Sequence, residues 1–283
     1  MDILEVRNLC KRYPAFELKN VSFSLEEGKI TGFIGRNGAG KTTTLKSIFN
    51  FVHPDGGEIR FFGKSFSENE LDIKQKVGFL SGGVDYYPKK MLKTITSITK
   101  SFYREWDEKA YEEYMKMWDL DEEKTPSQLS AGMRVKYALA LALSHRAKLL
   151  ILDEPTSGLD PVSRDELLDV LMELCGRGVT VLFSTHITSD LDKCADNILY
   201  IKGGRILAES DIRSFVSGYQ VLEFHDALPA GALGQKLIGC RRSKNGYTAL
   251  IRAEDARRMN AGAAGGDADL ETIMIHIEKE GEK

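Results

Sequence analysis

Long apolar runs are missing from this sequence. The longest uninterrupted apolar stretch is Tyr137–Leu143, seven residues, whereas an α-helix needs ~20 apolar residues to cross a bilayer. The first residues, Met1–Glu5, also lack the basic region and apolar core of a secretory signal. We therefore predict a cytoplasmic chain without a membrane-spanning helix, so that any role at a membrane depends on a partner.

The sequence also has no large excess of one charge. It contains 39 Lys and Arg residues and 42 Asp and Glu residues, which give a formal net charge of −3. The longest like-charged run is Asp121–Glu123. No basic arm therefore points to a nucleic acid or to an anionic membrane.

Cysteines are few, and without Cys-x-x-Cys spacing they favour packed or surface thiols over a redox or zinc centre. The four are Cys10, Cys175, Cys194 and Cys240.

What the sequence does contain is ordinary globular composition over 283 residues, with 42% hydrophobic and 29% charged residues. Val21, Phe23 and Leu25 alternate with polar residues, which predicts an antiparallel strand with one buried face. Leu149–Leu152 and Val179–Phe183 are short and apolar on both faces, as in central strands of a parallel sheet. These patterns predict an α/β fold with an antiparallel part near the N-terminus.

Helical periodicity dominates from about residue 91 to residue 145, and a later helix is predicted to begin after Asp160, which can cap it. After about Ser217 the patterns weaken to a hairpin-like Tyr247–Arg252 and a final helix. We interpret 217–283 as a small accessory α+β extension without a recognisable motif.

A phosphate-binding loop stands between a predicted strand and a predicted helix. Residues 35–42 read Gly-Arg-Asn-Gly-Ala-Gly-Lys-Thr and match the pattern Gly-x4-Gly-Lys-[Ser/Thr]. Glycines allow consecutive N–H groups to converge on phosphates, and the helix start adds the positive end of its dipole. Lys41 can reach the terminal phosphates, and the Thr42 hydroxyl can ligate Mg²⁺. The residues expected to hold a nucleoside triphosphate are Gly35, Asn37, Gly38, Gly40, Lys41, Thr42 and Thr43.

An acidic pair follows the apolar run Leu149–Leu152. Because ligands of α/β sheets bind at the carboxyl ends of the strands, Asp153 is predicted to hold Mg²⁺ and Glu154 to polarise the attacking water as a general base. Acidic pairs after apolar strands are otherwise common helix caps, and the phosphate loop favours the catalytic interpretation.

Five co-linear motifs resemble those of ATP-binding-cassette (ABC) ATPases, over about residues 2–216. They are the phosphate loop, the Asp153-Glu154 pair, and the runs 129–133, 157–160 and 184–186. The resemblance implies a P-loop NTPase core with an antiparallel β subdomain and a helical signature subdomain at about 91–145. It also implies ATP and Mg²⁺ as ligands, with Tyr13 stacked on the adenine.

Residues 129–134, Leu-Ser-Ala-Gly-Met-Arg, resemble the family signature, with Ala131 and Met133 replacing its commoner Gly and Gln. The resemblance implies a head-to-tail dimer in which Ser130 and Gly132 of one copy cover the ATP of the other. It also implies that Asp160 lies at that seam, although a helix cap is an equally good role. His186 resembles the switch histidine that contacts the γ-phosphate.

One departure from the family concerns a glutamine that usually ends the strand 77–80. This chain has Ser81-Gly82-Gly83 there, so either Ser81 or water substitutes, or the coupling differs. The chain is similar to ATPase subunits of small bacterial exporters, in which the segment 82–104 receives a separate permease. Tyr86, Tyr87 and Pro88 are candidate contacts, with a plain loop as the alternative.

We therefore expect an ATP-hydrolysing subunit that dimerises around ATP and Mg²⁺ and drives a separate transmembrane permease, an exporter of peptides, lipids or drugs. A homodimer is expected because both halves of the composite site are intact. The rival interpretation is a soluble ABC ATPase that acts as an assembly factor without transport. A third, an ATP sensor without turnover, is opposed by Glu154.

Overall fold

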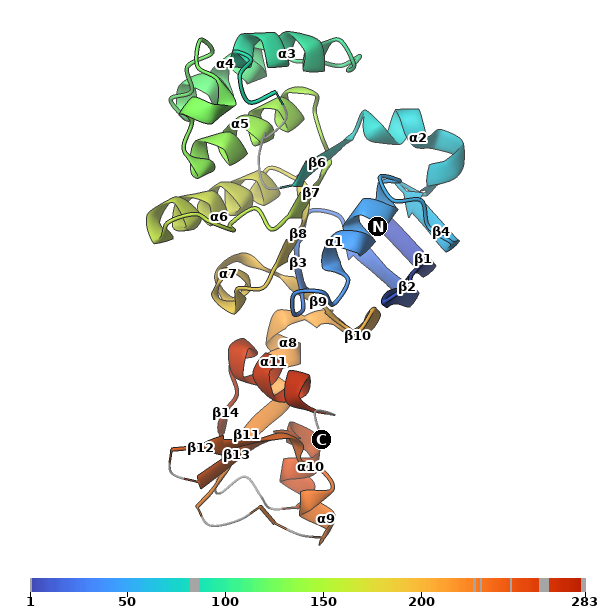
Figure 1. Ribbon diagram of the computed structural model, residues 1–283, viewed down its shortest axis with the longest axis vertical. Coiled ribbons are helices and arrows are strands. Elements are labelled where there is room, and N and C mark those ends of the chain that lie inside the picture. The colour runs from blue at the N-terminus through green and yellow to red at the C-terminus, as the bar shows by residue number, and fades with distance from the viewer. Residues whose placement is uncertain are drawn as a thin grey trace. The chain divides into compact units, whose positions relative to one another are not determined.

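The computed structural model describes residues 2–81, 87–225, 228–229, 231–244, 246–259 and 265–280. The chain divides into two compact units, residues 1–207 and 208–283 (Figure 1). Within the described ranges, we find no helix with the length and apolar character needed to span a membrane.

The first unit contains a six-stranded sheet in the order β10-β9-β3-β8-β7-β6. Neighbours β3/β9, β3/β8, β7/β8 and β6/β7 run parallel, which confirms the predicted α/β class. Its strands are β3 (Ile30–Ile34), β6 (Val77–Ser81), β7 (Leu149–Asp153), β8 (Thr180–Thr185), β9 (Asn197–Lys202) and β10 (Arg205–Asp211).

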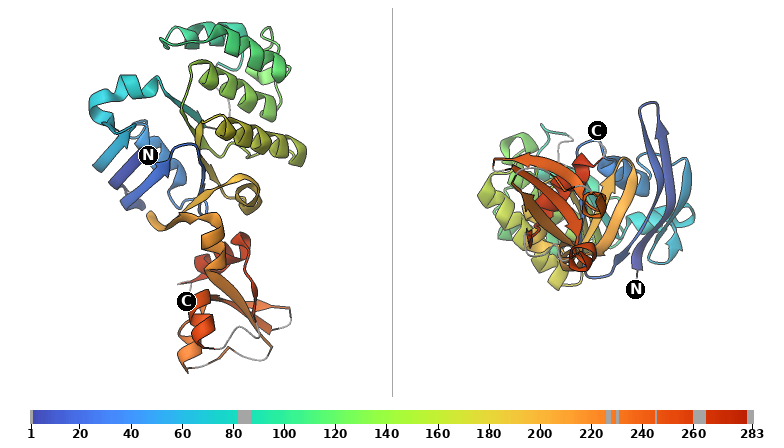
Figure 2. Two further views of the ribbon diagram at one scale, coloured as in Figure 1. Left: turned by 180° about the vertical axis from the view of Figure 1, so that it is seen from behind. Right: turned by 90° about the horizontal axis from the view of Figure 1, so that it is seen from below.

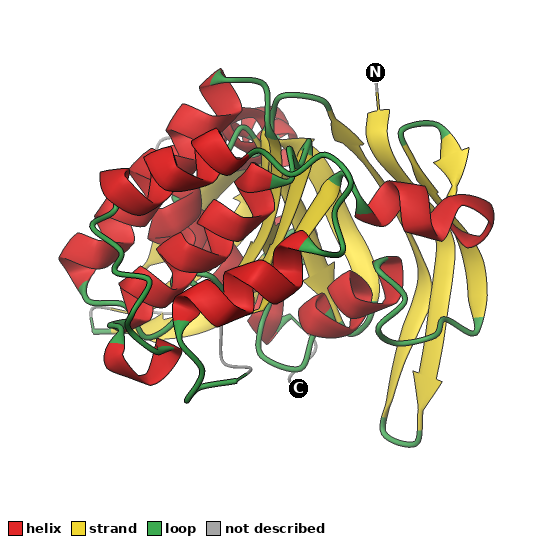
Figure 3. Cartoon of the chain, turned by 90° about the horizontal axis from the view of Figure 1, so that it is seen from above, coloured by secondary structure: helices red, strands yellow, loops and turns green. Residues whose placement is uncertain are grey.

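An antiparallel sheet in the order β2-β1-β4-β5 lies on the other side of helix α1 from most of the parallel strands (Figures 1 and 3). The alternation predicted around Val21 is confirmed, since Val21, Phe23 and Leu25 are buried. One apolar core joins this sheet, α1 and the parallel sheet. The elements are β1 (Asp2–Tyr13), β2 (Phe16–Glu26), β4 (Gly56–Phe61), β5 (Lys64–Ser65), α1 (Lys41–Ile48) and α2 (Phe66–Lys74).

Helices form a layer on the opposite side of the parallel strands (Figures 2 and 3). The helix predicted after Asp160 is confirmed as α6, whose N-terminus Asp160 caps by accepting from the backbone N–H groups of Val162 and Ser163. The helices are α3 (Leu92–Lys100), α4 (Glu108–Met117), a 3₁₀ turn (Pro126–Gln128), α5 (Ala131–Ser144), α6 (Pro161–Gly176) and α7 (Thr188–Cys194).

The second unit is a four-stranded sheet in the order β12-β13-β11-β14 with short helices. The predicted hairpin-like segment is strand β13, which pairs with β11 and β12, and the predicted final helix is α11. The elements are α8 (Ile212–Ser217), β11 (Tyr219–Phe224), α9 (Gly231–Gly234), β12 (Ile238–Ser243), β13 (Gly246–Arg252), α10 (Ala253–Arg258), β14 (Gly265–Asp267) and α11 (Leu270–Lys279).

The register of the parallel sheet determines where its polar strand ends meet. Ser81 lies opposite Asp153, and Asp153 opposite Ser184. On the other side, Ile34, the last residue of β3, lies opposite Thr185, the last residue of β8. The carboxyl ends of four strands therefore form one edge, where α/β sheets place their ligands.

Candidate nucleotide site

The loop between β3 and α1 can be built only with glycines at two of its positions. Gly40 has φ 117° and leads directly into α1. A Cβ on Gly40 would lie 2.8 Å from the Leu18 and Phe16 side chains, and one on Gly35 would lie 2.4 Å from the carbonyl oxygen of Ile201. No side chain caps the N-terminus of α1, so its first N–H groups and the helix dipole remain directed toward an incoming anion. Asn37 and Gly38 are exposed at the loop tip.

Lys41 is buried beneath this loop, with only 4% of its surface exposed. Its ammonium donates to the carbonyl of Gly35 at 2.8 Å and lies 3.5 Å from Oε1 of Glu154. Burial lowers the pKa of Lys41, while the charges of Glu154 and Asp153 oppose that shift. The ammonium is thus held in a fixed place at the base of the loop, between its carbonyls and an acidic residue.

Asp153 lies beside Thr42, as the sequence predicts for a metal site. The Thr42 hydroxyl donates to Oδ1 of Asp153 at 3.0 Å, and the Ser184 hydroxyl donates to the same oxygen at 2.7 Å. Hydroxyl and carboxylate oxygens are the ligands that Mg²⁺ prefers, so this donor set fits a magnesium ion. In the described part of the chain, this site included, no group of three or more His, Cys, Asp or Glu residues is arranged to hold a metal.

Glu154 and His186 meet from the ends of neighbouring strands β7 and β8. His186 Nδ1 lies 3.2 Å from Oε2 of Glu154, while the other carboxylate oxygen faces Lys41. Glu154 has φ 51°, a left-handed conformation that is uncommon for a residue with a long side chain and that clusters at active sites. Its N–H donates to the Ser184 hydroxyl at 3.0 Å. The carboxylate is therefore flanked by two cationic or ionisable groups and is 28% exposed.

The remaining predicted residues lie on the surface of the single chain. Ser130 caps α5 by accepting from the Met133 N–H at 3.2 Å, and Tyr13 is 40% exposed with Lys11 Nζ 5.7 Å from its ring centre. Within the described residues, no hydrogen bond or ion pair joins Ser130 or Asp160 to the phosphate loop. Gly132 follows Ser130 in the first turn of α5. Gly82 and Tyr86 lie outside the described residues.

Sequence reasoning missed the roles of Ser184 and Asp190. Ser184 connects the Asp153 carboxylate to the backbone of Glu154. In the sequence, Ser184 stands out only as part of the motif 184–186, and no role of its own could be predicted for it. Asp190 is buried at the start of α7. The signal available for Ser184 was a polar residue that follows an apolar run within a strand, whereas Asp190, in the first turn of α7, gave no such signal.

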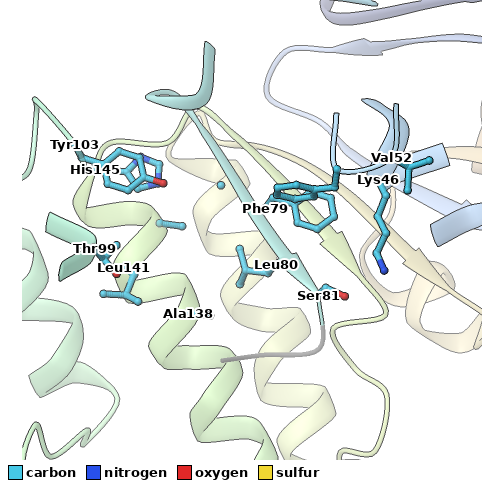
Figure 4. Close-up of a pocket in the computed structure, with 13 residues that line it drawn as sticks. Lys46, Val52, Phe79, Leu80, Ser81, Thr99, Tyr103, Ala138, Leu141 and His145 are labelled. Atoms are coloured by element: carbon cyan, nitrogen blue, oxygen red, sulfur yellow. The ribbon is translucent and has the colours of Figure 1, made fainter. Parts of the chain in front are cut away.

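A groove of about 560 Å³ lies beside β6, between the core and helices α3 and α5 (Figure 4). Phe79 stacks on Phe49 at 5.6 Å and meets the exposed Phe51 edge-on at 4.9 Å. At the other end Tyr103 stacks on His145 with ring centres 3.7 Å apart. Burial lowers the pKa of His145 to about 4, so the groove is aromatic and carries no histidine charge at neutral pH.

Known proteins match this chain in sequence and in structure. The family model for ABC transporters matches residues 18–157. The bacitracin transport ATP-binding protein BcrA of Bacillus licheniformis is 31% identical over 211 residues, which cover 73% of this chain and 69% of that protein. An uncharacterised ABC transporter ATP-binding protein of Bacillus subtilis, YxlF, is 33% identical over 256 residues, covering 88% of this chain and 83% of that protein.

Among solved structures, an ATP-binding subunit of an ABC transporter superposes with a TM-score of 0.67 at 27% identity, covering 75% of this chain and 93% of its own. A dimeric ATP-binding cassette in a post-hydrolysis state with ADP and Pi has a TM-score of 0.64 at 25% identity, covering 74% and 98%. With the phosphate loop, Lys41 and Glu154 assembled at the sheet edge, this chain belongs to the ABC transporter family, as an ATP-binding and ATP-hydrolysing subunit.

Proposed function

We propose that two copies of this chain enclose two ATP molecules with Mg²⁺, hydrolyse them, and thereby drive a separate transmembrane permease of an exporter at the cytoplasmic face of the membrane. The observation that carries the proposal is the position of Glu154, whose carboxylate lies between the buried Lys41 ammonium and His186. These groups converge at the carboxyl end of the sheet, beside the oxygen ligands Thr42 and Asp153.

Hydrolysis follows from the roles that these side chains can take. The phosphate loop and Lys41 bind and orient the terminal phosphates. Glu154 accepts the proton of the attacking water, and His186 donates to the γ-phosphate while its contact with Glu154 keeps the two groups in register. Mg²⁺, held by Thr42 and Asp153, would supply charge neutralisation of the β- and γ-phosphates.

The dimer is supported by the residues that the single chain leaves on its surface. Ser130 lies at the N-terminus of α5 and Asp160 at that of α6, and each helix start is a place where an anion is stabilised. Among the described residues, neither is hydrogen-bonded or ion-paired to the phosphate loop of its own chain, which fits a role toward the nucleotide of a second copy. Tyr13, exposed beside Lys11, is available to stack on adenine.

The permease is proposed to dock in the aromatic groove beside β6. Phe51 is 57% exposed and Phe102, in the adjoining segment after α3, is 72% exposed, and apolar side chains in such a patch favour a protein partner. Tyr87 and Pro88, the candidate contacts within the described residues, are also exposed. Relatives named for bacitracin transport, lantibiotic transport and Nod factor export support a role in an exporter of peptides, lipids or drugs.

The catalytic part is tested with Glu154→Gln, which keeps the size of the side chain and removes the base. We expect ATP binding to persist, turnover to fall by ~10³-fold, and an ATP-dependent dimer to accumulate, measured by light scattering. Glu26→Gln, at the exposed end of β2, is the matched control and should behave as the wild type. Unchanged turnover in Glu154→Gln contradicts the assigned base.

The transport part is tested by co-purification with the product of the adjacent gene, when that product contains several apolar segments. Phe51→Ser should weaken co-purification while ATP hydrolysis by the isolated chain persists. Leu71→Ser, which is 75% exposed on α2 outside the groove, is the matched control. An ATPase that hydrolyses ATP and dimerises but binds no membrane protein supports the soluble assembly-factor alternative.

A further inference from the structure

The accessory unit contains a cavity that the ATPase chemistry does not use. It has a volume of about 570 Å³ and lies between one face of the four-stranded sheet and helix α11. Thr272 and His276, one helical turn apart, line the cavity from α11, and Thr248 of β13 lines it from the sheet. The opposite face of the sheet carries Leu222 and Ile251, which pack on Ala256 of α10 in a separate apolar core.

Charged side chains are distributed unevenly around this cavity. Arg241, Arg242 and Lys244 line it at the edge strand β12 and the turn after it, whereas Glu223 of β11 and Asp267 of β14 line it further across the sheet. The ladder pairs Arg242 with Tyr247 and Asp267 with Gln220, on the other face of the sheet. On the cavity face, the charged residues are therefore Arg241 at one end, with Lys244 in the adjoining turn, and Glu223 at the other.

The two ends do not neutralise each other directly. Arg241 is opposite Thr248 in the ladder, and Thr248 is opposite Glu223, so Arg241 and Glu223 share a face two strands apart, about 10 Å between backbones. Across the described residues, none of the three basic side chains forms an ion pair with a carboxylate. The Thr248 hydroxyl lies in the gap between them.

The basic edge is fixed by an irregularity in β12. The pairing of β12 with β13 shifts between Ile238 and Arg241, and such bulges re-aim the side chain that follows. Within the bulge Gly239 has φ 55°, and a Cβ there would lie 1.7 Å from the carbonyl oxygen of His276, so only glycine allows α11 this close to the strand.

His276 fixes the wall on the helix side. It is 2% exposed, and its Nδ1 donates to the Gly239 carbonyl at 2.5 Å, which leaves Nε2 3.5 Å from the Thr248 hydroxyl. Burial, with the nearby charges of Arg241 and Lys279, lowers the pKa of His276. The neutral form of the ring is therefore favoured at pH 7, and the charge of the cavity comes from its two ends.

We propose that this cavity binds a small zwitterion with a phosphate at one end and a primary ammonium at the other, as in a phosphoethanolamine group. The phosphate would lie against Arg241 and Lys244, because cations match its charge and Arg binds its oxygens in bidentate fashion. The ammonium would lie toward Glu223. A free phosphoamine and a lipid headgroup share this chemistry.

The test is calorimetric titration of the full-length protein with O-phosphoethanolamine, inorganic phosphate and ethanolamine. We expect O-phosphoethanolamine to bind at least ~10-fold more tightly than either half. Arg241→Gln and Glu223→Gln should each weaken its binding by about 10-fold, whereas Arg258→Gln, on α10, should not. Chemical denaturation followed by circular dichroism, compared with the wild type, reports whether the accessory unit of each variant is folded.

Two results overturn the proposal. One is the absence of O-phosphoethanolamine binding to the wild type, and the other is binding of inorganic phosphate that is equally tight or insensitive to Glu223→Gln. Vesicles distinguish the sources. The site is assigned to a lipid headgroup if the protein sediments with phosphatidylethanolamine vesicles but not with phosphatidylcholine vesicles, and if this sedimentation is lost in Arg241→Gln. Binding of the free compound alone assigns it to a soluble ligand.

Discussion

The Thr156 hydroxyl donates a hydrogen bond of 2.7 Å to Oδ2 of Asp190, although the two residues are 34 positions apart. Thr185 donates to the same oxygen at 3.3 Å, and Asp190 is 1% exposed. Thr156 follows Glu154 by two residues, and Thr185 directly precedes His186. One buried carboxylate therefore joins the two loops that carry the proposed base and the histidine.

Asp190→Asn is expected to disturb the relative position of Glu154 and His186. The amide oxygen of Asn accepts hydrogen bonds from the Thr156 and Thr185 hydroxyls less strongly than the carboxylate oxygen of Asp190 does. Hydrogen bonds to a charged group contribute about 1.5–3 kcal/mol. We expect kcat for ATP hydrolysis to fall by ~10-fold, equivalent to ~1.4 kcal/mol, with KM for ATP nearly unchanged, measured by steady-state kinetics. Because a smaller folded fraction would also lower the apparent kcat with KM unchanged, kcat is calculated per ATP-binding site, counted by nucleotide titration.

The control for Asp190 is Ser189→Ala, one position earlier and exposed, which should keep wild-type kinetics. Asp190→Glu should restore part of kcat, because it keeps the charge. Wild-type kcat in Asp190→Asn would show that the two loops hold their positions without this carboxylate.

Lys41→Met separates nucleotide binding from folding. The ammonium that faces the phosphates is lost, so the Kd for ATP should rise by ~10²-fold, since charge-assisted hydrogen bonds of this kind contribute about 1.5–3 kcal/mol. Without nucleotide, the free energy of unfolding should not fall, because the variant no longer buries an ammonium. Fluorescent-nucleotide binding and chemical denaturation measure the two, with Lys46→Met in the last turn of α1 as control. Unaltered ATP affinity in Lys41→Met contradicts the assigned role.

His145 makes the stability of the first unit depend on pH. Burial lowers its pKa from 6.5 to about 4, so between these values the unfolded chain takes up a proton that the folded chain does not. Stability is therefore fully present above about pH 6.5 and decreases as the pH falls toward 4, by up to ~3 kcal/mol. Urea denaturation followed by Trp106 and Trp118 fluorescence measures this change.

The variant His145→Asn should flatten that pH dependence, since the titrating ring is removed. His53→Gln, at an exposed position, should leave it as in the wild type. An identical slope in His145→Asn and the wild type would assign the acid sensitivity to other groups.

Site residues can be predicted from the sequence where the chemistry allows only certain residue types. They are missed where their role depends on a hydrogen-bond partner that is distant in the sequence. The loop 35–42, Asp153 and Glu154 could be found because phosphate and metal binding demand these residues at fixed spacing. Asp190 and Ser184 could not, because their importance depends on Thr156 and Asp153, which only the folded sheet brings within reach. A polar residue at the end of a buried strand does not identify its partner.

The accessory unit shows the same limit for the fold. Its strand β13 and helix α11 could be predicted from local patterns, but the order β12-β13-β11-β14 could not. Strand β14 has the sequence Gly-Gly-Asp, which has no β propensity of its own and is extended because it pairs with β11. The bulge at Gly239 likewise depends on the close approach of His276.

Ser130 is expected to serve the fold and the dimer through the same hydroxyl, and two substitutions separate these roles. Ser130→Ala removes the acceptor for the Met133 N–H and should lower the free energy of unfolding by ~1 kcal/mol. Ser130→Asp keeps a good N-cap and a favourable charge at the helix start, so stability should return to that of the wild type or exceed it. The carboxylate of Ser130→Asp would repel the phosphates of a second copy's ATP, and Ser130→Ala lacks the hydroxyl that would bind them. The ATP-dependent dimer, measured by light scattering in the Glu154→Gln background, should therefore be lost in both variants. A dimer that follows stability, lost in Ser130→Ala and restored in Ser130→Asp, would mean that the hydroxyl acts only as a helix cap.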